Sequence, residues 1–174
     1  MNKKFLRDCN SAREEFQAFK FAYRVLRPDD LVYLREQSAV YKRAVQAVQE
    51  LILPVVRKNC PSCAFGTCCH LHSPELSIYI AKSIGGFNAV DYLLIRCDTE
   101  LPEPNFDNSD RNLCAFWDNG CRLKPDSRSL LCLQFFCEPL RHDLDMDLVN
   151  KRIAAVQSVL EHFSVGQLLQ KQRQ

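Results

Sequence analysis

The chain has 174 residues, of which 47% are hydrophobic and 25% are charged, and its formal net charge is +2. These values are typical of a single globular domain that buries its own core. So small a net charge argues against nucleic-acid binding, which requires a clustered basic excess. No run approaches the roughly 20 apolar residues of a membrane span. Charged residues interrupt the beginning of the chain, where a secretory signal would be apolar. We therefore expect a cytoplasmic protein without a nucleic-acid or membrane partner; its protein partner is not identifiable from the sequence.

Residues 1–58 predict a helical hairpin, and its first helix has a clear start signal. Ser11 and Glu14 have the spacing of a capping box, in which the two side chains satisfy backbone donors at a helix start. We expect this helix to end before Pro28, which has no backbone N–H to continue it. Its apolar residues recur at helical spacing and should belong to the core: Phe16, Phe19, Tyr23 and Leu26.

A second, longer helix should follow, with Asp29 or Asp30 as its N-cap. Pro54 lies near its end and should kink or terminate it. Because the connection between the two helices is short, we expect them to pack antiparallel. The face that should be buried carries Leu31, Leu34, Tyr41, Val45, Val48, Ile52 and Val55.

Residues 59–138 form the predicted metal-binding region, which begins with short elements. Ser73 and Pro74 have the pattern of an N-cap followed by proline at the first helical position. We expect a short helix from there to Gly85, where glycine can end it. For residues 87–95 both a buried strand and a helix fit the pattern, and we favour the helix.

The next stretch predicts a loop and then a hairpin. Residues 99–111 contain two prolines and many polar residues, which indicates a loop. Asn119 and Gly120 give the strongest short signal for a β-hairpin, because both positions of its turn favour positive φ. Such a hairpin would place Cys114 and Cys121 near each other at its base.

Two further helices are expected before the end of the chain. Residues 126–127 can cap a short helix that carries Cys132 and Cys137. The last helix should begin within residues 143–147 and stop at Gly166. We expect its apolar face to join the same core as the first two helices, through Leu148, Ile153, Val156, Leu160 and Phe163.

Eight of the ten cysteines lie in two segments of the metal-binding region. Two thiolates separated by two residues can bind one ion, and metal sites usually combine such a pair with a distant second group. Soft thiolates select zinc, copper(I) or iron–sulfur clusters over hard cations, and disulfides are rare in a reducing compartment. We predict that the two segments share a site, with the candidate ligands Cys60, Cys63, Cys68 and Cys69 from the first segment and Cys114, Cys121, Cys132 and Cys137 from the second. Eight thiolates could hold two four-thiolate sites or one cluster with spare ligands, and the order of the cysteines leaves their pairing open.

Several individual residues have other interpretations. Cys9 and Cys97 lie outside both segments and are expected to be non-ligands, because free cysteine packs as a small apolar residue. The Cys60–Cys63 motif could instead carry out thiol–disulfide exchange, although such motifs normally follow a strand. His70 or His72 could replace one thiolate as a ligand.

The two segments contain, in order, Gly66-Thr-Cys68-Cys69, Cys114-x-Phe116, Cys121, Arg128-x-x-x-Cys132 and Phe135. This pattern resembles the YkgJ-type cysteine-cluster family, which is described as a zinc- or iron-chelating domain and includes members with an iron–sulfur cluster. The chain departs from the family pattern in the two extra residues between Cys63 and the Cys68–Cys69 pair. It also has Ser129 and Leu133 where the family has proline and arginine.

We therefore expect a mainly α fold: a helical domain of residues 1–174 with a small β-hairpin, closed around a cysteine-ligated metal centre and ending in a helix within 139–174. The predicted function is to hold an iron–sulfur cluster or zinc. No motif indicates catalytic residues, so enzymatic activity stays open. One alternative is an enzyme or accessory factor that uses the cluster for redox or group transfer. Another is a zinc-stapled protein-interaction module, which full thiolate closure would favour.

Overall fold

The computed structural model describes residues 3–59, 89–111, 114–118, 121–134, 136 and 138–163, with most of their side chains from residue 13 onward. The helix predicted from Ser73 to Gly85 lies outside these residues. The described helical elements are α1 (Lys3–Arg24), α2 (Pro28–Asn59), α4 (Ala89–Arg96), η3 (Phe106–Arg111), η4 (Pro125–Ser127), α5 (Leu130–Gln134), α6 (Glu138–Asp143) and α7 (Met146–His162).

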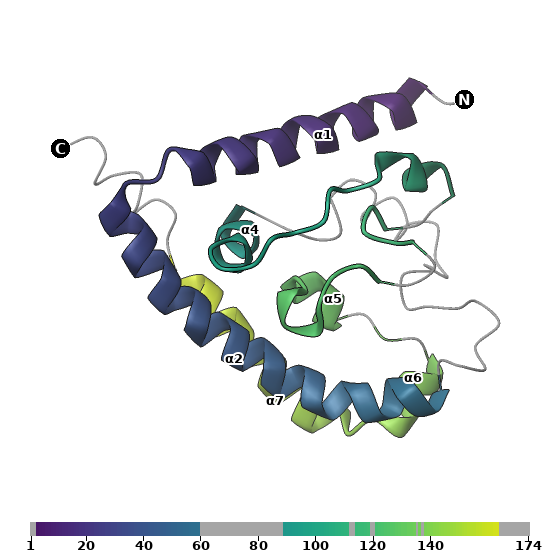
Figure 1. Ribbon diagram of the computed structural model, residues 1–174. Coiled ribbons are helices and arrows are strands. Elements are labelled where there is room, and N and C mark those ends of the chain that lie inside the picture. The colour runs from purple at the N-terminus through teal and green to yellow at the C-terminus, as the bar shows by residue number, and fades with distance from the viewer. Residues whose placement is uncertain are drawn as a thin grey trace.

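Helices α1 and α2 diverge from the corner at residues 25–27 and form the two arms of an open V (Figure 1). Helix α4 and the chain that follows it lie between the arms, where α4 contacts both α1 and α2. The antiparallel packing expected for residues 1–58 is therefore not observed. Each arm buries its apolar face against the segments inside the V, so neither helix needs the other as a packing partner.

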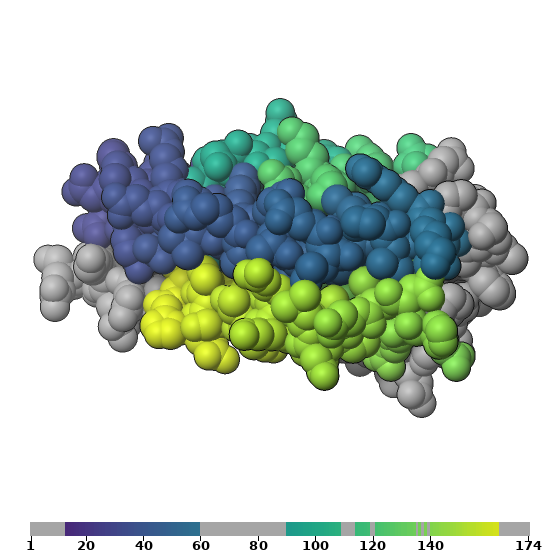
Figure 2. Space-filling model, turned by 90° about the horizontal axis from the view of Figure 1, so that it is seen from below, coloured from purple at the N-terminus to yellow at the C-terminus, as the bar shows by residue number. Residues whose placement is uncertain are grey.

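Helix α2 is the central element of the fold. Its 32 residues span about 48 Å at 1.5 Å per residue. Helix α7 runs along one side of α2, and the segments of residues 89–134 lie along its other side (Figure 2). Because α2 is covered from two directions, its buried face is wide and includes polar residues: Asp30, Leu34, Ser38, Tyr41, Val45, Val48, Gln49 and Ile52.

One hydrophobic core contains the apolar faces of α1, α2, α4 and α7, which confirms the prediction of a common core. Phe16 and Phe19 of α1 pack on Tyr92 of α4, with ring centroids 5.6 Å and 5.5 Å apart. The predicted buried face of α7 is confirmed at Ile153 and Val156, whereas Leu148 is 37% exposed and its neighbour Val149, at 1% exposed, is buried in its place. The largest fully buried members of the core are Tyr41, Phe116, Phe163, Leu34, Leu93, Leu94, Ile95, Leu133 and Leu140.

The start of α1 differs from the prediction. The helix begins at Lys3, so Ser11 lies inside it and is not the N-cap. A capping box marks a position where a helix is able to start, but a formed helix extends through further residues at little cost. The lysines and arginine of Lys3–Arg7 have good helix propensity, which allows this extension.

Helix α2 is also longer at both ends than predicted. It begins at Pro28, a position that suits proline because the first N–H of a helix has no helical partner. Asp30 therefore lies in the first turn, where it is 4% exposed and pairs with Arg27 at 3.0 Å. At the other end the helix passes through Pro54 and continues to Asn59, so Pro54 does not terminate it.

Within residues 59–138, the structure confirms the helix favoured for residues 87–95, which is α4. The predicted loop at 99–111 contains the 3-10 turn η3. The helix expected from residues 126–127 is divided into the 3-10 turn η4 and the helix α5, and α5 carries Cys132.

The last helix begins where it was expected. Asp145 is the N-cap of α7, and its side chain accepts a hydrogen bond from Leu148 N at 3.0 Å. The helix ends at His162, before the predicted stop at Gly166, which lies outside the described residues. Phe163 follows as the C-cap and stacks on Tyr33, with the two ring centroids 6.0 Å apart.

The residues that the structure describes are mainly helical, as predicted, and they contain no β-strand. At the position of the predicted hairpin, one antiparallel bridge joins Trp117 and Cys121. None of the helices described is both long and apolar enough to cross a membrane.

Candidate metal centre

Three of the eight predicted ligands lie in the described part of the chain: Cys114, Cys121 and Cys132. The other five lie outside it, and so do the two histidines considered as replacements: Cys60, Cys63, Cys68, Cys69, Cys137, His70 and His72. The structure thus describes three of the four cysteines of the second segment and the residues that hold them.

Cys114 begins a tight turn that several hydrogen bonds hold in place. Trp117 N donates to Cys114 O at 2.9 Å. The Asn108 side-chain amide donates to that same carbonyl at 3.0 Å and to Trp117 O at 2.7 Å. Cys114 is 5% exposed, and its Sγ accepts a hydrogen bond from the backbone N of Phe116 at 3.4 Å. The Cys114 sulfur is therefore an acceptor whose position is set by its own turn.

Cys121 lies on the return side of this turn. It forms the antiparallel bridge with Trp117, and the neighbouring Arg122 N donates to Phe116 O at 2.9 Å. The Cys121 Sγ donates to Leu123 O at 3.8 Å. The pairing observed here is between Cys121 and Trp117, and the turn residues 119–120 lie outside the described part of the chain.

Cys132 lies in α5, and Ser129 forms two hydrogen bonds with it. The Ser129 hydroxyl accepts from Cys132 N at 3.4 Å and donates to Cys132 Sγ at 3.3 Å. Burial raises the pKa of the Cys132 thiol above its ordinary value, and the nearby Cys121 adds to this effect. The hydrogen bond from Ser129 and the positive charge of Arg128 act in the opposite direction. The electrostatic effect of Cys121 on Cys132 indicates that these two thiols share one part of the molecule.

A buried polar network connects the helical core to the backbone just before Cys132. The Tyr41 hydroxyl lies 2.9 Å from Asp91 Oδ1 and 3.3 Å from Arg128 O, and these two acceptors share its single proton. Tyr41 is 0% exposed and Asp91 is 1% exposed. Burial, followed by the charge of Asp91, raises the pKa of the Tyr41 phenol well above its ordinary value, so the hydroxyl keeps its proton. Helices α2 and α4 therefore determine where the chain enters α5.

A second set of contacts fixes the end of α2. Lys58 Nζ and Asn59 Nδ2 lie 2.9 Å and 3.0 Å from Asp143 Oδ2, at the end of α6. The hydrogen bonds from Asn59, Lys58 and His142 lower the pKa of the Asp143 carboxyl well below its ordinary value of 3.8. In the sequence, the first cysteine segment begins immediately after Asn59, and the second ends immediately before α6. The described residues adjacent to both segments are thus held at one end of the molecule (Figure 1).

The described cysteines do not form a complete site by themselves. Across the described ranges, no three or more His, Cys, Asp or Glu side chains lie close enough together to hold a metal ion. A tetrahedral or cubane centre needs about four protein ligands. The remaining predicted ligands lie beyond the described residues, so the centre stays a prediction.

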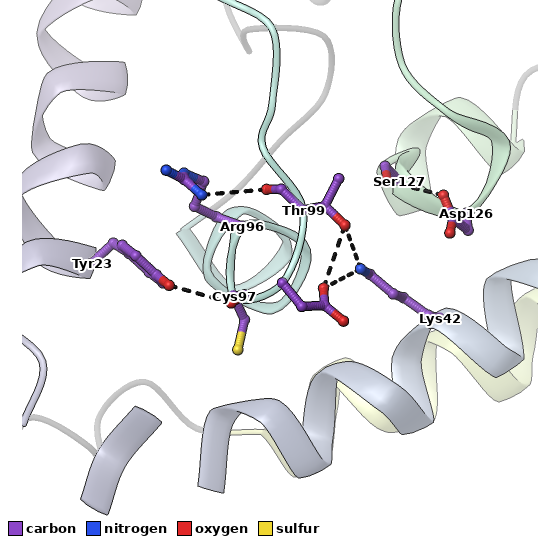
Figure 3. A network of polar contacts seen from close by, with 8 residues as sticks. Tyr23, Lys42, Arg96, Cys97, Thr99, Asp126 and Ser127 are labelled. Atoms are coloured by element: carbon purple, nitrogen blue, oxygen red, sulfur yellow. Dashed lines mark hydrogen bonds and ion pairs between the residues drawn. The ribbon is translucent and has the colours of Figure 1, made fainter. Parts of the chain in front are cut away.

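Cys97 lies apart from this region, between α1 and α2 (Figure 3). It is a free thiol, 7% exposed, and its backbone O accepts from the Tyr23 hydroxyl at 3.3 Å. Beside it, Lys42 binds Asp98 and Thr99 and so ties the end of α4 to α2. Burial is the main reason that the pKa of the Cys97 thiol is raised. The packing interpretation of Cys97 fits this environment, and its predicted absence from the ligand set stays a prediction.

The sequence pattern identifies cysteines but misses the polar residues around them. Periodicity assigns Tyr41 to an apolar stripe, and Asp91 has only the pattern of a helix start. Their hydrogen bond joins positions 50 residues apart and has no local signal. Ser129 does have one, because it stands three positions before Cys132, the spacing at which an N-cap hydroxyl reaches a backbone N–H.

No protein-family model matches the chain, and neither the curated proteins nor the solved structures contain a significant match. The resemblance to the YkgJ-type family rests on the order of the cysteines and stays a prediction.

Proposed function

We propose that this protein holds an iron–sulfur cluster or zinc through thiolates from both cysteine segments. Cys114, Cys121 and Cys132 are ligands from the second segment, and Cys137 and the cysteines of residues 60–69 supply the remainder. The turn at residues 114–123 belongs to a small β-hairpin at the edge of this centre, so that the helical domain closes around the metal.

The observation that carries the proposal is the hydrogen bonding of two sulfurs. Cys114 Sγ accepts from Phe116 N at 3.4 Å, and Cys132 Sγ accepts from the Ser129 hydroxyl at 3.3 Å. A neutral thiol is only a weak acceptor, whereas hydrogen bonds to an ionised acceptor are about twice as strong as neutral ones. Donors directed at both sulfurs therefore suit metal-bound thiolates, whose ligand atoms are usually held by such bonds.

The charges near Cys132 also fit an anionic centre. Arg128 is close enough to lower the pKa of the Cys132 thiol. Its Nε–H is buried and has no hydrogen-bond partner within the described part of the chain. A buried donor without a partner costs roughly 1–3 kcal/mol, and an anionic sulfur within its reach would remove that cost. Four thiolates around a divalent metal carry net negative charge, which the guanidinium would partly balance.

The helical scaffold supports a centre that both segments share. Lys58 and Asn59 bind Asp143, and α6 has only six residues, which span about 9 Å. The residues that adjoin the two cysteine segments are therefore fixed within a short distance of each other. This arrangement lowers the entropy cost of bringing the two segments to one metal.

The two candidate groups would serve different chemistry. A cluster would supply one-electron transfer, and zinc would supply a structural cross-link. The contribution of this chain is the same for both groups: the cysteines bind, and the donors around them orient the sulfurs. In each case the free energy of metal binding adds to the folding free energy of the two segments.

Anaerobic purification followed by metal analysis, acid-labile sulfide analysis and visible spectroscopy tests this proposal. Iron and sulfide in a brown protein would identify a cluster, and zinc in a colourless protein would identify a structural site. We expect one of these results. A metal-free protein that binds no added zinc and cannot be reconstituted with iron and sulfide would contradict the proposal.

Cysteine variants test the ligand set. We expect Cys114→Ser and Cys132→Ser to lose tight metal binding, because serine lacks the soft thiolate. Cys97→Ser is a matched control, since Cys97 is 7% exposed and Cys114 is 5% exposed but Cys97 lies outside both segments. The control should keep its metal. An equal loss of metal binding in all three variants would show that the substitutions act through the fold, and it would contradict the ligand assignment.

A further inference from the structure

The side chain of Ser129 contacts both the backbone and the sulfur of one predicted ligand. Its oxygen accepts Cys132 N–H at 3.4 Å, and its O–H donates to Cys132 Sγ at 3.3 Å. Ser129 is 0% exposed, so bulk water does not compete for either bond. A hydroxyl can make both bonds at once, because it accepts through a lone pair and donates through its proton.

The core fixes the position of Ser129. The carbonyl of the preceding residue, Arg128, accepts a hydrogen bond from Tyr41 at 3.3 Å, and Tyr41 also binds Asp91. These contacts come from α2 and α4, which are packed in the hydrophobic core. The serine hydroxyl is therefore aimed at Cys132 by the scaffold.

We propose that Ser129 is a positioning residue of the metal centre: its hydroxyl fixes the Cys132 sulfur and stabilises that sulfur as a bound thiolate. This inference rests on the proposed function, because it takes Cys132 to be a ligand. Hydrogen bonds to ligating sulfurs tune both metal affinity and reduction potential. A donor stabilises the more negative, reduced form of a cluster, so the Ser129 hydroxyl raises the reduction potential.

Ser129 also has a structural role that the test must separate from this one. Its bond to Cys132 N is an N-cap interaction of α5, and removing it destabilises the protein whether or not metal is bound. The energy of the sulfur-to-metal charge-transfer absorption reports on the Sγ hydrogen bond instead. A hydrogen bond lowers the energy of the sulfur electrons, so its loss moves this absorption to longer wavelength.

The experiment uses the full chain, made metal-free under anaerobic reducing conditions and titrated with Co²⁺ and then with Zn²⁺ in competition with a chelator. We expect Ser129→Ala to bind both metals roughly 10–100-fold more weakly and to shift the cobalt charge-transfer band to longer wavelength. Ser129→Thr keeps the hydroxyl and should restore the band position. If the native centre is a cluster, Ser129→Ala should also have a more negative midpoint potential.

Ser127→Ala is the matched control. Ser127 is 1% exposed, and its hydroxyl donates to Asp126 Oδ1 at 3.0 Å instead of to a sulfur (Figure 3). This variant should retain the affinity and the band position of the wild type. If Ser129→Ala does not fold, Ser129→Gly is judged by the same two measurements, because glycine is tolerated at an N-cap.

The outcomes distinguish the two proposals. A wild-type protein that binds neither metal and accepts no cluster overturns the proposed function, and this inference with it. In a second outcome the wild type binds metal while Ser129→Ala, or Ser129→Gly in its place, has the same affinity and band position as Ser127→Ala. That result overturns this inference alone. Weaker binding without a band shift would leave only the capping role, which also refutes the inference.

Discussion

Tyr41→Phe removes one hydroxyl from the polar network that leads from the core to Cys132. The hydroxyl lies 2.9 Å from Asp91 Oδ1, and both residues are at most 1% exposed. A hydrogen bond to a charged group contributes about 1.5–3 kcal/mol, because the partner loses solvation that it cannot recover. Phenylalanine preserves the ring and leaves no cavity larger than the hydroxyl. We therefore expect the free energy of unfolding to fall by about 1.5–3 kcal/mol.

Urea denaturation followed by far-ultraviolet circular dichroism measures this loss. Tyr33→Phe is the control, because Tyr33 is 37% exposed and contributes mainly its ring, which stacks on Phe163. The control should change stability by less than about 0.5 kcal/mol. A double-mutant cycle with Asp91→Asn should give a coupling energy of about 0.5–3 kcal/mol. Zero coupling, or a loss for Tyr41→Phe no larger than that of the control, would refute the role of the network.

Three further predictions test the balance between core, surface and metal. Val48 is 0% exposed, so Val48→Asp should unfold the domain even with excess metal, and a native circular dichroism spectrum for this variant would contradict us. Chelation of the wild type should leave most of the helical circular dichroism signal, because the hydrophobic core holds the helices together. Complete loss of helix would show that the metal, and not the core, holds the fold. The pKa of the Asp143 carboxyl is lowered in the folded protein from its ordinary value of 3.8. The carboxylate therefore stabilises the fold when the pH is above 3.8, and this contribution is lost as the pH falls through the lowered pKa. The stability difference between wild type and Asp143→Asn should therefore shrink in acid, and a difference independent of pH would exclude this linkage.

Local signals in the sequence were sufficient to place most helices. Pro28 separates α1 from α2, and Asp145, inside the predicted range, caps α7. Both depend on short-range chemistry, namely a missing N–H and a side-chain acceptor. The helical period likewise predicted the buried faces of α1 and α2. For α7 the period correctly predicted Ile153 and Val156, but at the start of the helix Val149 is buried instead of Leu148, because the neighbouring α2 decides which residues are covered.

Features set by tertiary contacts could not be predicted in this way. The V between α1 and α2 depends on what fills it, and a short connecting loop does not reveal that. Pro54 remains inside α2, whose last residues gain partners from α6 through Asp143. The candidate ligands were readable because cysteine spacing is a property of the sequence. Of the donors around them, Ser129 has a local signal but Tyr41 has none, since it reaches Arg128 across 87 positions.

The arrangement of these donors bears on how the predicted centre would form. The path of the chain into α5 is fixed by Tyr41, which is buried in the helical core and binds Asp91 of α4 as well as Arg128 O. The Cys114 turn is held by Asn108 and by its own backbone. Both sets of contacts join residues in the described part of the chain, so the helical core contributes to the geometry around Cys114 and Cys132. Ligands that are held in place in advance would lower the entropy cost of metal binding. On this argument the core would orient the predicted ligands of the second segment, and a bound metal would join that segment to the first.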